Sequence, residues 1–193
     1  MKPRWLLFCL LLVYLATGIF QIKPGEWALV CRFGKPLQEL RGPGLHWGLP
    51  WGLDQVHRVA VDEQRRLVVG YLDEAGPDDS LAPLNQAAPS GHLLTGDNQM
   101  INLRVIVLYR VQRKKLAEYV QQQHKMEDLL QRATEEVMTK ITASQRIDHL
   151  LTGRTAAVES AMADNLRERM APYNTGVLID SVNPRNLSKF SVM

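Results

Sequence analysis

Apolar and polar residues alternate most regularly along the stretch from Leu93 to Val111. In its second half an apolar side chain recurs at every other position. The residues that share this face are Ile101, Leu103, Val105, Val107, Tyr109 and Val111. A period of two that is rich in β-branched residues predicts a long strand with one buried face. The turn-forming run Gly96-Asp97-Asn98 precedes it, so we expect Leu93–Thr95 to pair back on the strand as a short hairpin arm.

Shorter alternating stretches predict further strands. They are Glu26–Phe33, Val56–Val61, Arg65–Tyr71 and Val177–Val182. The first carries Trp27, Leu29, Cys31 and Phe33 on one face and is expected to stop at Gly34-Lys35-Pro36. The segment Arg41–Gly52 is dense in glycine and proline, which predicts an ordered loop. Its aromatic and leucine side chains indicate that this loop packs against the body of the protein or dips towards a membrane interface.

A period of three to four residues predicts helices in the second half of the chain. Leu116–Leu151 follows this period, with one expected break near His124 and another at Thr142–Arg146. Arg154–Met170 predicts a second amphipathic helix, which Ala171-Pro172 should end. Its inward residues are expected to be Val158, Ala161, Met162 and Leu166.

Strands followed by helices predict an α+β domain, with a mostly antiparallel sheet and the helices packed on one side. Two segments lack any periodicity. Leu72–Gly91 contains three prolines and several acidic residues, which predicts a flexible insertion in the domain. Residues 184–193 are expected to form a short C-terminal tail.

Residues 5–22 form an apolar run that follows a basic tail, residues 1–4. As a helix this run would be about 27 Å long, close to the hydrocarbon thickness of a bilayer, so we expect a transmembrane anchor. Lys2 and Arg4 favour a cytoplasmic N-terminus, with the folded part on the outer face. Cleavage of a signal peptide after Gly18 is the alternative, but apolar residues continue past that point through Ile22.

Charge and cysteine content add little to this picture. The 193 residues carry a formal charge of +3, and setting aside Lys2 and Arg4 leaves 21 basic against 20 acidic side chains. Such a balance argues against a nucleic-acid-binding surface. The two cysteines, Cys9 and Cys31, lie in the apolar run and on a predicted strand, without metal-binding or redox spacing. The predicted helices carry a face of mixed charge, which solvent or neighbouring subunits can cover. Its residues are Glu118, Glu127, Asp128, Arg132, Glu135, Glu136, Lys140, Arg146, Glu159, Arg167, Glu168 and Arg169.

No motif for catalysis, cofactor binding or metal binding is present, so we expect a protein that is not an enzyme. The five histidines are scattered, and His46 is interpreted as a packing or hydrogen-bonding residue. The turn around Asp97 accounts for that residue without catalysis. Serines 144, 160 and 181 have no GxSxG context. Because the partners of a catalytic serine can be distant in sequence, a membrane-associated hydrolase or peptidase stays open as an alternative. A binding module secreted after signal cleavage is the other.

Several motifs, taken in order, resemble the SPFH or band 7 family, which includes stomatin, prohibitin, flotillin and HflK. VCRFGK at residues 30–35 follows the apolar run, and GPGLHWGLP occupies residues 42–50. LLTGDNQMINLRVIVLYRV at residues 93–111 is similar to paired strands of the family, and residues 132–182 to its helical half and closing strand. The resemblance covers residues 23–183, and the sequences of its motifs are most similar to the HflK branch.

The resemblance implies a non-enzymatic, single-pass scaffold of the bacterial inner membrane, with its SPFH domain on the periplasmic face. It implies homo-oligomers, or hetero-oligomers with an HflC-like protein, and modulation of the membrane AAA protease FtsH. It implies no cofactor. Family members usually continue into a long coiled coil after the closing strand, whereas the last ten residues here contain no heptads.

Overall fold

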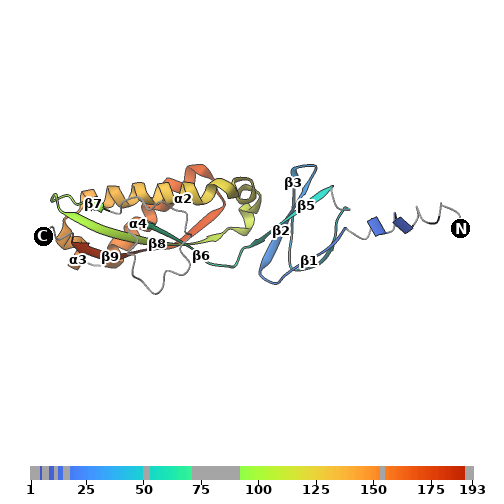
Figure 1. The fold of residues 1–193 in the computed structure, drawn as a ribbon, viewed down its shortest axis with the longest axis horizontal. Coiled ribbons are helices and arrows are strands. Elements are labelled where there is room, and N and C mark those ends of the chain that lie inside the picture. Colours follow the sequence, from blue (N-terminus) through green and yellow to red (C-terminus); the bar gives the residue numbers. More distant parts are fainter. Residues whose placement is uncertain are drawn as a thin grey trace.

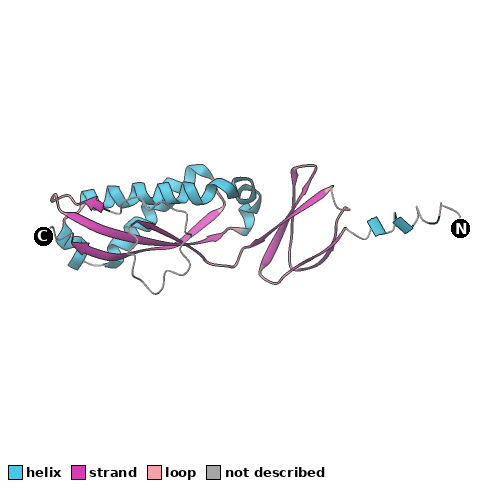
Figure 2. Ribbon diagram, viewed as in Figure 1, coloured by secondary structure: helices cyan, strands magenta, loops and turns pink. Residues whose placement is uncertain are grey.

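The computed structural model describes residues 5, 9–10, 13–14, 18–49, 53–70, 92–152 and 155–189. The molecule is elongated and has two lobes (Figure 1). The N-terminal lobe, built from the described residues between 18 and 60, has strands as its only regular elements. The helical lobe, built from the described residues between 65 and 189, contains the helices and a second sheet (Figure 2).

Antiparallel pairing organises the N-terminal lobe. Strand β1 (Ile19–Ile22) pairs with β4 (Gly44–Trp47) in a two-stranded ribbon. Strands β2 (Glu26–Arg32), β3 (Lys35–Arg41) and β5 (Asp54–Ala60) form a sheet with the order β3-β2-β5. The sequence predicts β2 and β5 correctly to within two residues at their ends.

Strand β8 (Met100–Val111) is the centre of the helical lobe. Every residue of its predicted inner face is at most 3% exposed, which confirms the period-two interpretation. Strands β6 (Arg65–Gly70) and β7 (His92–Leu94) pair with one edge of β8, and β9 (Val177–Lys189) pairs with the other. Strand β7 is the predicted hairpin arm.

Helices cover one face of this sheet (Figures 1 and 2). They are α2 (Leu116–Ser144), α3 (Ile147–Thr152) and α4 (Thr155–Met170), with 3₁₀ turns η1 (Arg113–Lys115) and η2 (Ala171–Tyr173). The α+β prediction is therefore confirmed. The break between α2 and α3 is also confirmed, because Gln145 has extended backbone angles. The predicted break near His124 is wrong: α2 continues through it, since the surrounding glutamines and lysine are good helix formers.

A continuous apolar core joins the two lobes. Leu29 and Val59 of the N-terminal lobe belong to the same buried cluster as the residues under α2. The Arg113 guanidinium lies 3.4 Å from the centre of the Trp27 ring, a cation–π contact between the lobes. The start of β2 therefore contacts the helical lobe, whereas its last residue, Arg32, contacts Asp54 within the N-terminal lobe.

The structure corrects the end of the predicted membrane helix. Ile19–Ile22 form strand β1 because they pair with β4, and Ile22 is 1% exposed in the resulting contact. Residues 5, 9–10 and 13–14 are helical. Within the part of the chain that the structure describes, no helix has both the length and the apolar character to span a membrane.

Proline and glycine concealed three further strand segments. Strand β4 lies within the predicted loop, and β3 begins at Lys35, where a strand end was expected. Strand β9 runs on to Lys189, so residues 184–189 are not part of a tail. Pro36 and Pro184 are tolerated because β3 and β9 are edge strands, which need fewer backbone donors.

The predicted insertion, Leu72–Gly91, lies outside the described residues. Its flanking strands nevertheless define where it leaves the sheet. Gly70 pairs with Arg104 and His92 pairs with Asn102, so a single register position of β8, that of Leu103, separates β6 from β7. The two strands thus follow one line along the edge of β8.

Candidate membrane-facing surface

The β1–β4 ribbon has one apolar face towards the protein and one towards solvent. Cross-strand partners share a face, and Ile19 pairs with Trp47, whereas Phe20 pairs with His46. On the inner face Ile22 is buried, and Phe20 and His46 are half-buried. On the outer face Ile19 is 51% exposed and Trp47 is 70% exposed. The register of the ribbon therefore places large apolar side chains on the face that is exposed to solvent.

Polar contacts fix the ribbon in this orientation. His46 donates from Nε2 to the Gly42 carbonyl at 2.8 Å, and its ring stacks on Phe20 at 5.9 Å. This places His46 in the packing role that the sequence predicts. Arg41 donates to the Trp47 carbonyl at 2.7 Å and lies 5.7 Å from the Phe20 ring.

More exposed apolar residues lie at the same end of the lobe. Leu45 is 74% exposed on the outer face of the ribbon, and Leu49 after β4 is 38% exposed. Phe33, in the turn between β2 and β3, is 75% exposed. We call this surface the apolar end. It consists of Ile19, Phe33, Leu45, Trp47 and Leu49.

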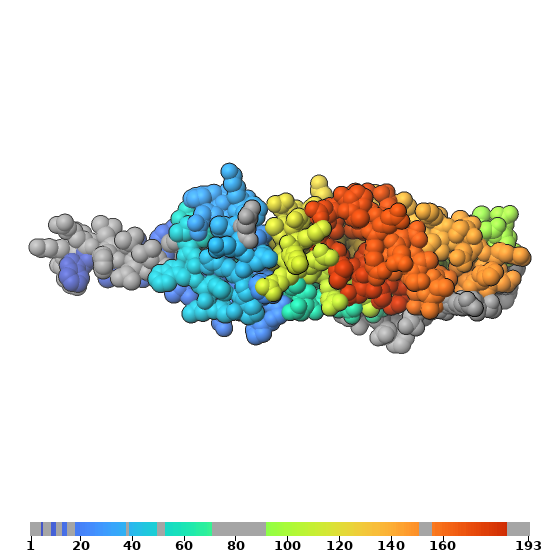
Figure 3. All heavy atoms as spheres, turned by 180° about the vertical axis from the view of Figure 1, so that it is seen from behind, coloured from blue at the N-terminus to red at the C-terminus, as the bar shows by residue number. Residues whose placement is uncertain are grey.

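Backbone contacts bring the apolar end to the point where the chain enters the lobe. Gly48 donates its N–H to the Gly18 carbonyl at 2.9 Å, and a Cβ on Gly18 would lie 2.5 Å from the Gly48 oxygen. Only glycine fits at position 18. The Phe33 N–H donates to the Leu53 carbonyl at 3.3 Å. Figures 1 and 3 place the N-terminal lobe between the described N-terminal helical residues and the helical lobe.

A buried carboxylate secures these segments. Asp54 accepts hydrogen bonds from Arg32 Nε at 3.0 Å and Nη2 at 3.3 Å, and from the Leu49 N–H at 2.9 Å. The Arg32 guanidinium is the main cause that lowers the pKa of Asp54 below its ordinary value. One ionised side chain thus connects the ends of β2 and β4 with the start of β5.

The other residues that were considered for a chemical role make contacts that support the fold. Asp97 accepts from the Thr95 hydroxyl at 2.6 Å and from the Ile147 N–H at 3.2 Å, which attaches the β7–β8 turn to the start of α3. The Thr95 hydroxyl is the main cause of the lowered pKa of Asp97. The hydroxyls of Ser144 and Ser160 donate to carbonyls of their own helices, those of Ile141 and Ala157.

Ser181 and the two cysteines are the remaining candidates. Ser181 lies on β9 opposite Leu108. Burial raises the pKa of the Cys31 thiol, whereas Cys9 is exposed. Among the described residues no three His, Cys, Asp or Glu side chains come together as metal ligands.

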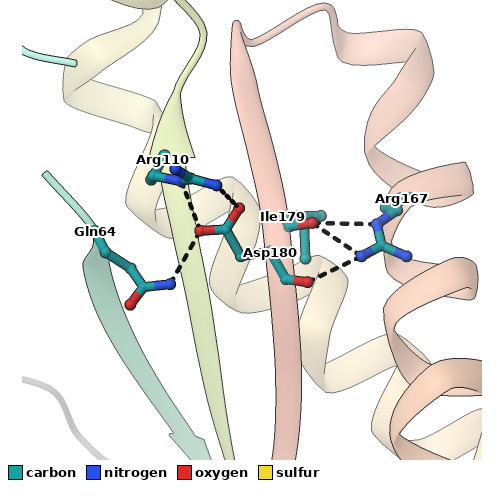
Figure 4. Close-up of polar contacts among 5 residues, drawn as sticks. All are labelled: Gln64, Arg110, Arg167, Ile179 and Asp180. Atoms are coloured by element: carbon teal, nitrogen blue, oxygen red, sulfur yellow. Dashed lines mark hydrogen bonds and ion pairs between the residues drawn. The ribbon is translucent and has the colours of Figure 1, made fainter. Parts of the chain in front are cut away.

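Part of the predicted mixed-charge face is used inside the molecule. Arg169 of α4 pairs with Glu136 of α2 at 2.7 Å. Arg110 of β8 pairs with Asp180 of β9 at 2.8 Å, and Arg167 donates to backbone carbonyls of β9 (Figure 4). The Arg110 guanidinium is the main cause of the lowered pKa of Asp180. These pairs hold α4 and β9 in place, so the charged pattern is not a wholly free surface.

The sequence did not predict the apolar end as a unit. Its alternation placed Phe33 on the buried face of a strand, whereas Phe33 lies in a turn. The signal that could have corrected this is Phe33-Gly34 between two strand-forming segments, which fits a two-residue hairpin turn. Ile19 was assigned to a membrane helix, because an apolar run alone does not separate a helix from a buried strand.

Comparisons with known proteins agree with the resemblance in sequence. A model of the SPFH domain / Band 7 family matches residues 20–188. The chain is 28% identical over 174 residues to the Escherichia coli protein named modulator of FtsH protease HflK, covering 90% of this chain and 36% of that protein. It is 26% identical over 172 residues to protein HflK of Haemophilus influenzae, covering 89% of this chain and 36% of that protein.

A relative of lower identity is matched over a larger share of its own length. Protein HflK of Borreliella burgdorferi is 22% identical over 180 residues, covering 92% of this chain and 55% of that protein. This chain spans about a third of the length of the Escherichia coli and Haemophilus relatives. The family model covers most of the chain and includes both lobes. The chain therefore belongs to the SPFH domain / Band 7 family.

Proposed function

We propose that this chain is a non-enzymatic membrane scaffold whose apolar end is seated in the bilayer. The exposed apolar end is the observation that carries the proposal. Large apolar side chains clustered on a surface mark a contact with another molecule or a membrane. Trp47 is suited to the bilayer interface, because its ring is apolar and its indole N–H can be hydrated.

The bounds of β1 support contact between this lobe and lipid. Residues 5–17, the apolar residues before the lobe, would span only about 20 Å as a helix, less than the roughly 30 Å hydrocarbon thickness of a bilayer. An anchor of this length fits the hydrocarbon thickness of the bilayer if the apolar end occupies part of the outer leaflet. We propose that the N-terminal tail is cytoplasmic and that both lobes lie on the periplasmic side of a bacterial inner membrane.

The relatives support a regulatory role. A protein whose name describes it as a modulator of FtsH protease matches both lobes of this chain. We propose that this chain assembles with copies of itself or with an HflC-like protein, and that the assembly modulates an FtsH-type protease. Mixed charges on α2 and α4 that have no ion-pair partner among the described residues are available to align neighbouring subunits.

Flotation of the full chain with liposomes tests the membrane proposal. We expect the wild-type chain to float after removal of detergent, and the variant Leu45→Asp/Trp47→Asp to be released more readily by alkaline washing. The variant should bind more weakly because two charged groups, and no longer two apolar ones, would have to be buried in lipid. Leu94→Asp is the matched control, since Leu94 is 54% exposed in the helical lobe. A wild-type chain that stays soluble and unbound contradicts the proposal.

A further inference from the structure

The turn between β2 and β3 has an unusual residue at its tip. Arg32 and Lys35 are paired, so the loop is the two-residue segment Phe33-Gly34. Both residues have positive φ, 49° and 77°, as in a type I′ turn. Asn or Gly normally occupies the first position, because a bulky side chain is strained there. We call residues 32–35 the hairpin tip.

Two further features of the hairpin tip are unfavourable for a protein in water. Phe33 is 75% exposed, so folding gains little from its ring. Arg32 and Lys35 are opposite each other across the strands, where like charges repel, and the Asp54 carboxylate that pairs with Arg32 offsets only part of this repulsion. A strained, exposed apolar side chain beside a cation that has no ion-pair partner among the described residues favours a contact outside the folded chain.

The environment of the tip identifies the contact. The tip belongs to the apolar end, where Phe33 is bonded through its backbone to Leu53. An open hollow beside it has Pro36 and Leu37 in its wall and Arg32 and Lys35 near the tip. An apolar wall with cations at its edge matches a phospholipid, which has an acyl region and a phosphate.

The described acidic groups nearby leave Lys35 unpaired, although Asp54 offsets part of the charge of Arg32. The Asp54 side chain is 2% exposed and accepts its hydrogen bonds inside the lobe. Glu39 also lines the hollow, but it lies four residues beyond Lys35 on β3, about 13 Å further from the tip. Lys35 is exposed and has no ion-pair partner among the described residues. The outermost charge at this end is therefore positive.

We propose that the hairpin tip binds anionic phospholipid headgroups, with Phe33 in the interfacial layer and Lys35 and Arg32 on the phosphates. This inference rests on the proposed membrane function and adds a lipid class to it. A cation held near an anionic membrane surface gains roughly five-fold in binding. Arg32 remains bonded to Asp54 through Nε and Nη2 and supplies Nη1, whereas Lys35 supplies a whole ammonium group.

Fluorescence quenching by brominated lipids tests the contact. The full-length variant Phe33→Trp is reconstituted in vesicles of phosphatidylcholine and phosphatidylglycerol, with the bromine on one or the other lipid. The fluorescence of the new tryptophan is obtained by subtracting the fluorescence of the wild-type chain in the same vesicles. We expect stronger quenching when phosphatidylglycerol carries the bromine.

Charge variants separate lipid selectivity from simple insertion. Lys35→Gln in the Phe33→Trp chain should lower the preference for phosphatidylglycerol by up to about five-fold. Lys125→Gln, an exposed lysine on α2, should leave it unchanged. Equal quenching by the two lipids overturns the anionic preference. No quenching in a chain that still floats overturns the whole inference, whereas a chain that does not float overturns the proposed membrane function as well.

A stability measurement distinguishes a lipid contact from a structural role of Phe33. Phe33→Asn should raise the midpoint of thermal unfolding, because Asn-Gly is the preferred pair in this turn. The same variant should shorten retention of the chain on anionic vesicles. A lower midpoint would show that the ring of Phe33 supports the fold, and would overturn the inference.

Discussion

At the scale of single residues, Asp54 determines the geometry of the apolar end. Its side chain is 2% exposed and accepts from two nitrogens of Arg32 and from the Leu49 N–H. A buried carboxylate with partners of this kind stabilises the ionised form. Without the charge, the end of β2 and the segment after β4 would lose their common acceptor.

The variant Asp54→Asn should lower the free energy of unfolding by about 2 kcal/mol at neutral pH, as for loss of a charged hydrogen bond. The folded-state pKa of Asp54 is below its ordinary value of 3.8, so the stabilisation is present above that pH. It is lost as the pH falls through the lowered pKa. Denaturant unfolding of both proteins between neutral and acidic pH measures this.

The exposed residue Asp128 on α2 supplies the control for this prediction. Asp128→Asn should change stability little at any pH in that range. If the difference in free energy of unfolding between the wild-type chain and Asp54→Asn were the same at all pH values, the role of the Asp54 charge would be contradicted.

Residue-level interpretation from sequence succeeded where the cause is local. The turn position of Asp97 and the packing role of His46 follow from their neighbours, and the structure gives both residues matching contacts. The Arg32–Asp54 pair joins residues 22 positions apart, and no local pattern predicts it. The exposure of Phe33 depends on a turn that is visible only once β3 is known to pair with β2.

At the scale of elements, α4 and β9 are held together at an irregular point of the sheet. The pairing of β8 with β9 shifts between Leu108 and Tyr109. Arg167 of α4 donates to the Ile179 carbonyl at 3.0 and 3.1 Å and to the Asp180 carbonyl at 3.1 Å (Figure 4). Its guanidinium thus satisfies carbonyls of an edge strand next to a bulge.

Arg167→Met should lower the free energy of unfolding by about 1–2 kcal/mol, because the aliphatic stem is retained but the donors to β9 are lost. Hydrogen exchange should also become faster in β9 around Ile179. Arg132→Met, an exposed arginine on α2, should have little effect. Equal stability of both variants would show that Arg167 does not support the bulge.

Elements with a strong period were predictable. Strand β8 and helices α2 and α4 bury the faces that their sequences indicate. Strands β3, β4 and the second half of β9 were not predicted, because their prolines and glycines lack a local strand signal. They exist because a neighbouring strand, β2, β1 or β8, supplies the pairing partner.

At the scale of the whole molecule, the fold separates two surfaces. The apolar end includes the β1–β4 ribbon, beside the point where the chain enters the N-terminal lobe, and the Trp27–Arg113 contact joins this lobe to the helical lobe. The two lobes also share one core, which limits their independent motion. Seating the apolar end in a bilayer would therefore direct the helical lobe away from the membrane, where α2 and β9 can meet other subunits.

Spin-label accessibility in vesicles tests most directly whether the apolar end faces lipid. The full chain, with Cys9 and Cys31 replaced by alanine, carries one label at position 45 in the apolar end or at position 94 in the helical lobe. We predict that oxygen relaxes the label at position 45 more strongly than a water-soluble nickel complex does, and that position 94 shows the reverse. Stronger relaxation by the nickel complex at both positions would contradict a membrane-facing apolar end.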